Sequence, residues 1–132
     1  MSKLQALTAL RDKVKAGDVG YNGFLDIAEL AFNRADVFSI DAWKAYNGSL
    51  DAAKALHEAV LPNMPVSIVD MTHNYLGGHG WKVSVNWPHI EWKRTFTANG
   101  PFSYKATNKD PARAWLLAIL EALIAKEETD NG

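Results

Sequence analysis

The segment that most limits the possible folds of this chain is the apolar stretch ARAWLLAILEALIA at residues 112–125. Asp110 and Pro111 precede it, and an N-cap residue followed by proline is a typical helix start. Trp115 lies on one face of the expected helix, and the neighbouring leucines and isoleucines extend the apolar surface around its axis. A helix that is apolar over most of its surface is buried on more than one side. We therefore expect this helix, over residues 111–127, at the centre of the domain or at a subunit interface.

Helix signals also fill residues 2–60, where apolar residues recur at the spacing of a helix. Serines precede three of these stretches, and glycine or proline follows them, as is typical of helix starts and stops. The four expected helices lie between Ser2 and Gly17, from Asn22 to about Phe32, from Ser39 to Gly48, and from Leu50 to Val60 after the cap Ser49.

After Pro65 the spacing of apolar residues changes from helical to alternating. Between Trp81 and Trp87 apolar and polar side chains alternate strictly, which is typical of a half-buried strand. A similar alternation begins at Ile90, and turn signals separate these segments. We expect a short antiparallel sheet of three to four strands within residues 66–106. Helices followed by such a sheet and a final helix predict an α+β fold.

The bulk composition narrows the function classes. A chain of 132 residues suits one domain. The formal net charge of −1 argues against a DNA- or RNA-binding protein and against binding to a membrane surface. The absence of cysteine excludes disulfides and thiolate zinc sites. The N-terminal residues indicate a helix rather than a signal peptide, and no apolar run approaches the roughly 20 residues of a membrane span, so a cytoplasmic protein is expected.

A stretch rich in histidine, glycine and tryptophan, HNYLGGHGWKVSVNWPHIEW, covers residues 73–92. His73, His79 and Asp70 offer metal ligands, but no pair of them has a recognised metal-binding spacing such as HExxH. Backbone N–H groups of LGGHG could bind phosphate, yet a strand follows where a phosphate loop has a helix. A hairpin whose glycines take positive φ explains the stretch better than either site. We therefore expect no metal and no cofactor.

No arrangement of side chains in the sequence indicates a catalytic site. None of the serines lies in the nucleophile-elbow pattern GxSxG, and Ser39 and Ser49 are explained as helix caps. His57 falls within an alanine-rich helix and is expected to be partly exposed. Glu127 and Glu128 belong to a polar tail. We therefore expect a protein that is not an enzyme and has no catalytic residues.

Aromatic and basic residues near the predicted hairpin allow two interpretations. The tryptophans lie on the apolar faces of adjacent strands, which favours aromatic packing across the strands. Alternatively, Trp81 stacks on a base while Lys82, Lys93 and Arg113 contact phosphates. Arg94 is in phase with the apolar residues of its strand. It therefore either extends to the sheet edge or pairs with an anion in a cleft.

Three parts of the chain carry a family resemblance. YNGSLDAAKALHEAVLP at residues 46–62, a tryptophan-containing hairpin, and DPARAWLLAILEALIA at residues 110–125 resemble the phage ABA sandwich domain family. The similarity covers roughly residues 39–126. It implies an α/β/α sandwich, with the sheet packed between helices, and a bacteriophage or prophage protein in the host bacterial cytoplasm. It brings no catalytic residues to this chain.

The expected function is binding without catalysis. As a bacteriophage accessory protein, the chain would bind a small molecule, for example by sequestering a nucleotide-like molecule of host defence. The alternative is a protein–protein interaction or assembly module, either a homo-oligomer or an inhibitor of a host protein, because the last helix is apolar over a wide surface. The candidate ligand-binding residues are Trp43, His73, His79, Trp81, Lys82, Lys93, Arg94 and Arg113.

Overall fold

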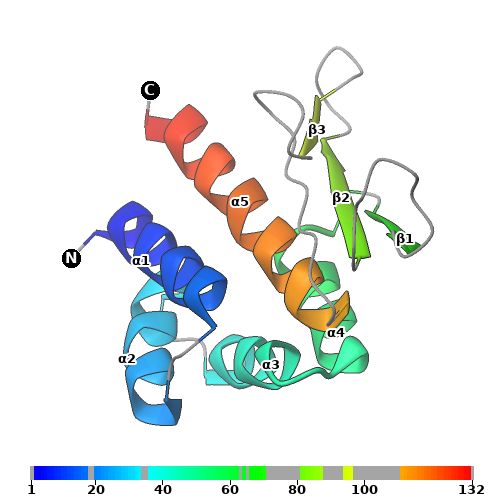
Figure 1. Cartoon of the computed structure of the whole chain (residues 1–132). Helices are drawn as coiled ribbons and strands as arrows, with labels where there is room; N and C mark the ends of the chain where they lie inside the picture. The colour runs from blue at the N-terminus through cyan, green and yellow to red at the C-terminus, as the bar shows by residue number, and fades with distance from the viewer. Residues whose placement is uncertain are drawn as a thin grey trace.

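In the part of the chain that it describes, the computed structural model contains five helices and three strands (Figure 1). Side chains are described for residues 2–17, 20–33, 37–62, 64 and 111–128, and the backbone is also described at residues 36, 66–70, 81–87, 94–96 and 129–131. The elements are α1 (Lys3–Ala16), α2 (Tyr21–Ala31), α3 (Asp36–Tyr46), α4 (Leu50–Val60), β1 (Val66–Asp70), β2 (Trp81–Trp87), β3 (Arg94–Phe96) and α5 (Pro111–Asn131).

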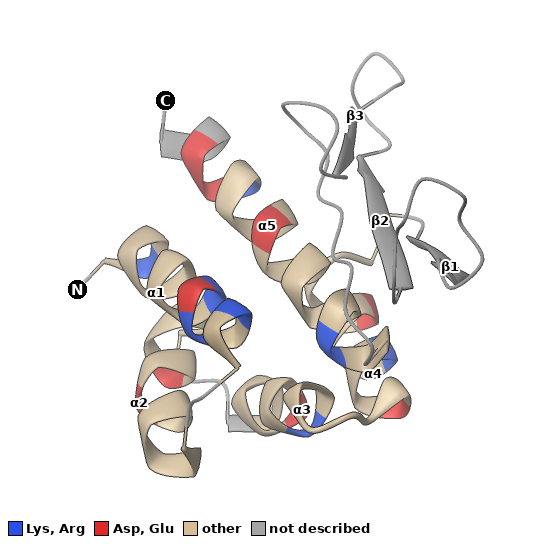
Figure 2. Ribbon diagram, viewed as in Figure 1, with Lys and Arg blue, Asp and Glu red and all other residues tan. Residues whose placement is uncertain are grey.

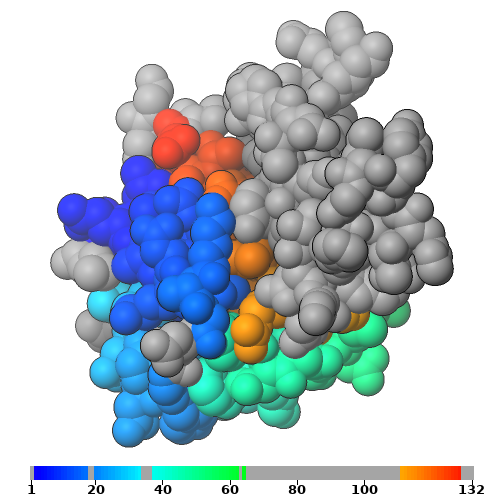
Figure 3. Space-filling view, viewed as in Figure 1, coloured from blue at the N-terminus to red at the C-terminus, as the bar shows by residue number. Residues whose placement is uncertain are grey.

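The last helix, α5, lies at the centre of the molecule. It contacts α1, α3 and α4 as well as β2 and β3, and its residues from Ala112 to Ile124 are buried except for the half-buried Arg113 and Glu121. On the face drawn in Figure 3, part of α5 is visible beside α1. The predicted central position is therefore confirmed. The helix continues to Asn131 instead of ending at residue 127.

The predicted α+β fold class is wrong, and with it the α/β/α sandwich. Of the residues whose side chains are described, 85% are helical. The described core is formed by residues of the helices together with Phe32 and Leu61, which directly follow α2 and α4. The apolar stripes of α1 to α4 are buried against one another and against α5, so that this core needs no sheet between helical layers. The fold is therefore predominantly helical.

The three strands form a small sheet beside α5. Their order is β1-β2-β3, and both pairs are antiparallel, with Val66 opposite Val85 and Val85 opposite Phe96. Figure 1 shows the described helices on one side of this sheet only. A sandwich would have helices over both faces, which is the arrangement that the described elements do not form.

The first helix begins and ends where the sequence predicts. The Ser2 hydroxyl accepts a hydrogen bond from the Gln5 backbone N–H at 3.1 Å, and the Gln5 side chain accepts one from the Ser2 N–H at 2.9 Å. This reciprocal pair satisfies two N–H groups that a helix start otherwise leaves without partners. Gly17 ends the helix with a φ of 72°, a left-handed conformation that glycine adopts without a Cβ clash. Leu7, Leu10 and Val14 are buried, as their spacing predicts.

The third helix begins earlier than predicted. It starts at Asp36, so Ser39 lies inside the helix and is not its cap. Phe38, in the first turn of this helix, packs edge-on against Phe32, with ring centroids 6.4 Å apart. The missed signal is Asp36 itself, because an acidic residue is favourable in the first turn of a helix.

The fourth helix has the predicted bounds. The Ser49 hydroxyl accepts a hydrogen bond from the Ala52 N–H at 3.1 Å, and Asp51 occupies the first turn, where an acidic residue is stabilising. Ala53 and Leu56 are buried. The prediction for His57 is wrong, because this residue is only 5% exposed.

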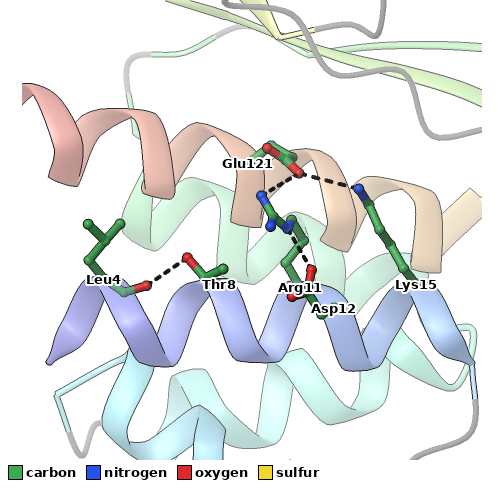
Figure 4. Close-up of polar contacts among 6 residues, drawn as sticks. All are labelled: Leu4, Thr8, Arg11, Asp12, Lys15 and Glu121. Atoms are coloured by element: carbon green, nitrogen blue, oxygen red, sulfur yellow. Dashed lines mark hydrogen bonds and ion pairs between the residues drawn. The ribbon is translucent and has the colours of Figure 1, made fainter. Parts of the chain in front are cut away.

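A network of charged side chains joins α1 to α5, which run antiparallel (Figure 4). Arg11 Nη1 lies 3.2 Å from Glu121 Oε1, and its Nε lies 3.1 Å from Asp12 Oδ1. Burial lowers the pKa of Arg11, but the charges and hydrogen bonds of Glu121 and Asp12 outweigh it and raise this pKa above its ordinary value. Lys15 Nζ adds a longer contact of 3.8 Å to Glu121. Figure 2 shows that both α1 and α5 carry basic and acidic residues.

Among the helices of the described residues, none combines the length and the apolar character that a membrane crossing requires.

Candidate functional site

The pockets lined by described residues include two that bear on function, and the larger of these two has a volume of about 490 Å³. It lies where α1 begins, where α2 and α4 end, and where the C-terminal part of α5 passes. Helix ends cannot interdigitate as closely as helix sides, so space remains where several of them meet. We call this space the helix-end pocket. Its lining residues are Lys3, Ala31, Phe32, Asn33, Phe38, Ala59, Val60, Leu123, Lys126 and Glu127.

The wall of the helix-end pocket contributed by α2, α3 and α4 is mainly apolar. Phe32 is the C-cap residue of α2, and its ring meets that of Phe38 at an interplanar angle of 80°. Val60 ends α4 and is partly buried against the core, and Leu123 of α5 completes this wall. The aromatic pair is held by its own edge-to-face contact, which is a favourable geometry for two rings.

Asn33 is the polar residue of that wall. Its backbone has a φ of 54°, and it is the one described residue other than glycine with positive φ. Asparagine tolerates this left-handed conformation better than most residues do. Asn33 therefore turns the chain away from the axis of α2 directly after the C-cap Phe32, at the edge of the pocket.

The charged residues of the helix-end pocket come from α1 and α5. Lys3 is the first residue of α1, and its Nζ lies 3.9 Å from Glu127 Oε2. Lys126 is exposed beside them. A partly exposed pair at this distance, such as Lys3 and Glu127, contributes about 0–1 kcal/mol to stability. The pocket thus combines a mainly apolar wall with a charged wall of two ammonium groups and one carboxylate.

The second pocket is a groove of about 230 Å³ between α2 and α3. It is lined by Tyr21, Leu25, Glu29, Ser39 and Ile40. The Ser39 hydroxyl is buried and has no hydrogen-bond partner among the described residues. Tyr21 and Ile40 are 52% and 43% exposed, so this face presents apolar side chains to solvent.

Two of the predicted site residues, Trp43 and Arg113, are brought together through Tyr46. The rings of Trp43 and Tyr46 are stacked, with centroids 5.6 Å apart and an interplanar angle of 19°. The Arg113 guanidinium lies 4.1 Å from the centre of the Tyr46 ring, and its Nε donates a hydrogen bond to the Tyr46 carbonyl at 3.0 Å. These contacts join α3 to the N-terminal end of α5, away from the helix-end pocket.

For the other predicted site residues, the structure describes no side-chain contacts. His73, His79 and Lys93 lie outside the described residues. Trp81 and Lys82 belong to β2 and Arg94 to β3, where the backbone is described and the side chains are not. Their role in ligand binding stays a prediction. Among the residues that the structure does describe, no group of three potential metal ligands comes together.

A polar contact that the sequence analysis missed is centred on His57. Trp115 Nε1 donates a hydrogen bond to His57 Nδ1 at 3.1 Å. Nδ1 is therefore the acceptor, so Nε2 carries the proton and donates to the Met64 carbonyl at 2.6 Å. This buried histidine joins α4, the residues after it and α5. Its spacing in phase with Ala53 and Leu56 could have indicated burial.

Lys3, Lys126 and Glu127 were also missed as site residues. Nothing in the sequence pairs the first residue of one helix with the last turns of another. Only the antiparallel packing of α1 on α5 brings them together, and Figure 1 shows both chain ends on the same side of the molecule.

Comparison with known proteins gives no match to a family model, to a curated protein or to a solved structure. The resemblance to the phage ABA sandwich domain family stays a prediction.

Proposed function

We propose that this protein acts by binding and not by catalysis, and that it holds a small molecule in the helix-end pocket. The observation that carries this proposal is the division of the pocket into a mainly apolar wall and a charged wall. Binding pockets for small molecules are typically mostly apolar with a few polar groups that fix orientation, and their volumes are roughly 300–1,000 Å³. The volume of about 490 Å³ lies within that range.

The proposed biological setting is that of a bacteriophage accessory protein that sequesters a small molecule of its host. The family resemblance supports this setting, and the pocket supplies a place for the molecule. A nucleotide-like ligand at the predicted hairpin is the other form of the same proposal. Trp43 and Arg113 belong to the same proposed site, but the contacts described for them are made with Tyr46. The nucleotide proposal therefore depends on the candidate residues within the range 73–94.

The test uses Nile red, an uncharged dye whose fluorescence rises in an apolar environment. Ala59 lines the pocket and is exposed, so Ala59→Phe places a ring in the pocket without entering the core. Ala55 is an exposed alanine one turn earlier on α4 and is not among the lining residues, so Ala55→Phe is the matched control. We expect dye binding to wild type and Ala55→Phe and weakened binding to Ala59→Phe. Absence of binding, or equal binding to both variants, would refute the proposal.

An assembly function is the second candidate, and the groove between α2 and α3 favours it. The helix on which this alternative was based, α5, is covered within the chain. Val37 and Ile40 of α3 are instead 66% and 43% exposed, and they are neighbours on the helix surface. If this face forms a dimer, sedimentation should show a dimer whose fraction rises with protein concentration. The double variant Val37→Ser with Ile40→Ser should then be a monomer. The control variant Leu50→Ser changes another exposed apolar residue and should still form the dimer. A monomer at all concentrations would exclude this candidate.

A further inference from the structure

We infer that the ligand of the helix-end pocket is a small amphiphile with one carboxylate and an apolar tail, an inference that rests on the proposed function. It also implies that Glu127 is a built-in counter-ion, which the carboxylate of the ligand replaces beside Lys3.

The position of the apolar lining residues defines where the tail lies. Phe32, Phe38 and Val60 come from α2, α3 and α4, whereas every charged residue of the pocket comes from α1 or α5. Leu123 of α5 is the exception, because it lies next to Lys126 and Glu127 on the helix surface, but the other large apolar groups of the lining are on the wall opposite the charged residues. A ligand that is apolar at one end and charged at the other matches this division, because its apolar end then contacts the apolar wall and its charged end contacts the charged wall.

The charge of the pocket defines the sign of the head group. Lys3 and Lys126 carry two positive charges, and Glu127 carries one negative charge. Lys126 makes no ion pair among the described residues. The excess of one positive charge favours an anion with a single charge. A carboxylate accepts hydrogen bonds from ammonium groups and fits this requirement.

The start of α1 adds to the positive potential at the same wall. The first turn of this helix contains no acidic residue, and its first residue is Lys3. The N-terminus of a helix carries a partial positive charge, so an acidic group is usually favourable there and a lysine is not. In this chain the compensating carboxylate comes from α5, through Glu127.

The contact between Lys3 and Glu127 is loose enough to be exchanged. Its length is 3.9 Å, and the two side chains are 39% and 24% exposed. A ligand carboxylate that approaches along the apolar wall can take the place of Glu127 beside Lys3, and Lys126 can then contact the same group. Lys126 should therefore strengthen binding of the carboxylate, and Glu127 should weaken it.

The experiment is calorimetric titration of the full chain with octanoate below its micelle-forming concentration, and with octanamide as the uncharged analogue. We expect octanoate to bind more tightly than octanamide. Lys126→Gln should weaken octanoate binding by roughly three- to tenfold and leave octanamide binding unchanged.

Substitutions of the two neighbouring glutamates provide the opposite test. Glu127→Gln removes the competing carboxylate and should tighten octanoate binding by a similar factor. Glu128 is exposed and does not line the pocket, so Glu128→Gln is the matched control for the change in net charge. An equal gain in both variants would show a general charge effect and would overturn the counter-ion role of Glu127.

The outcomes separate this inference from the proposed function. If Nile red binds and Ala59→Phe weakens it, but octanoate and octanamide bind equally, the pocket binds ligands and the inferred head group is wrong. If Nile red does not bind, or binds equally to Ala59→Phe and Ala55→Phe, the proposed function itself is wrong. Tighter binding of octanoate that Lys126→Gln does not affect would place the anion site elsewhere in the chain.

Discussion

The two ends of α5 are surrounded by different kinds of contact. At the N-terminal end, Arg113 donates to the Tyr46 carbonyl at 3.0 Å and Trp115 donates to His57 at 3.1 Å. At the C-terminal end, Lys126 and Glu127 border a pocket of about 490 Å³, and the described ion pair there spans 3.9 Å. The first end is closed by hydrogen bonds of a half-buried arginine and of the buried pair Trp115 and His57, and the second is open.

This difference separates what stabilises the fold from what remains available for a ligand. A buried polar group that loses its partner is costly, so paired groups such as those of His57 hold their neighbours in one arrangement. Exposed lysines beside an apolar wall contribute little to stability and can change partners. Changes at the closed end should therefore affect unfolding, and changes at the open end should affect binding.

The largest effect is expected at Trp115. Trp115→Ala removes a buried aromatic ring and the donor to His57, and it should lower the free energy of unfolding by about 3–5 kcal/mol. Trp115→Phe keeps most of the ring and leaves His57 Nδ1 without its donor, so it should cost about 1–3 kcal/mol. Urea unfolding followed by circular dichroism measures both values.

A double-mutant cycle isolates the hydrogen bond itself. His57→Leu removes the acceptor for Trp115 and the donor to the Met64 carbonyl. Because the two side chains are hydrogen-bonded, the losses from His57→Leu and Trp115→Phe should fall short of additivity by about 0.5 kcal/mol or more. Strict additivity would mean that the two residues do not interact.

An intermediate effect is expected midway along α5, where Glu121 meets Arg11. Arg11→Gln should lower the free energy of unfolding by about 1 kcal/mol, because the guanidinium is partly buried between two carboxylates. Lys13→Gln, at an exposed lysine of the same helix that makes no ion pair among the described residues, should change it by less than about 0.5 kcal/mol. Equal losses would assign the effect to net charge.

The pH dependence of the contribution of Arg11 to stability follows from the direction of its pKa shift. The pKa of Arg11 is raised in the folded state, so its stabilisation is complete below the ordinary arginine pKa and is lost only as the pH rises through the raised value. The difference in unfolding free energy between wild type and Arg11→Gln should not decline between pH about 7 and about 10. A decline over that interval would contradict this assignment.

The smallest effect on stability is expected at the open end. Lys126→Gln should change the free energy of unfolding by less than about 0.5 kcal/mol, because the side chain is exposed and makes no ion pair among the described residues. Thermal unfolding without ligand measures this change. A loss comparable to that of Arg11→Gln would show that the two ends of α5 do not differ as described.

Local signals in the sequence predicted the helices well. Ser2 and Ser49 cap α1 and α4 because a serine with extended backbone can accept from the N–H groups of the first turn. Ser39 did not follow this rule, because α3 already begins at Asp36 and Ser39 lies inside the helix. A serine is therefore not the cap when an acidic residue that is favourable in a first turn precedes it.

The fold class and the helix-end pocket could not be predicted in the same way. An apolar helix such as α5 must be covered, but its composition does not determine whether helices or a sheet cover it. The sequence suggested a sheet between helices, whereas the described core is helical. The pocket depends on the approach of Lys3 to Glu127, residues that are far apart in the sequence and have no local pattern that relates them.

The most direct test of the difference between the two ends is nuclear magnetic resonance of the labelled full chain during titration with octanoate. We predict that the signals of Val60, Leu123 and Lys126 shift progressively, while the indole N–H signal of Trp115 and the backbone signal of Arg113 stay in place. Shifts at Trp115 as large as those at Leu123, or no shift around the pocket, would contradict the account of a closed end and an open end.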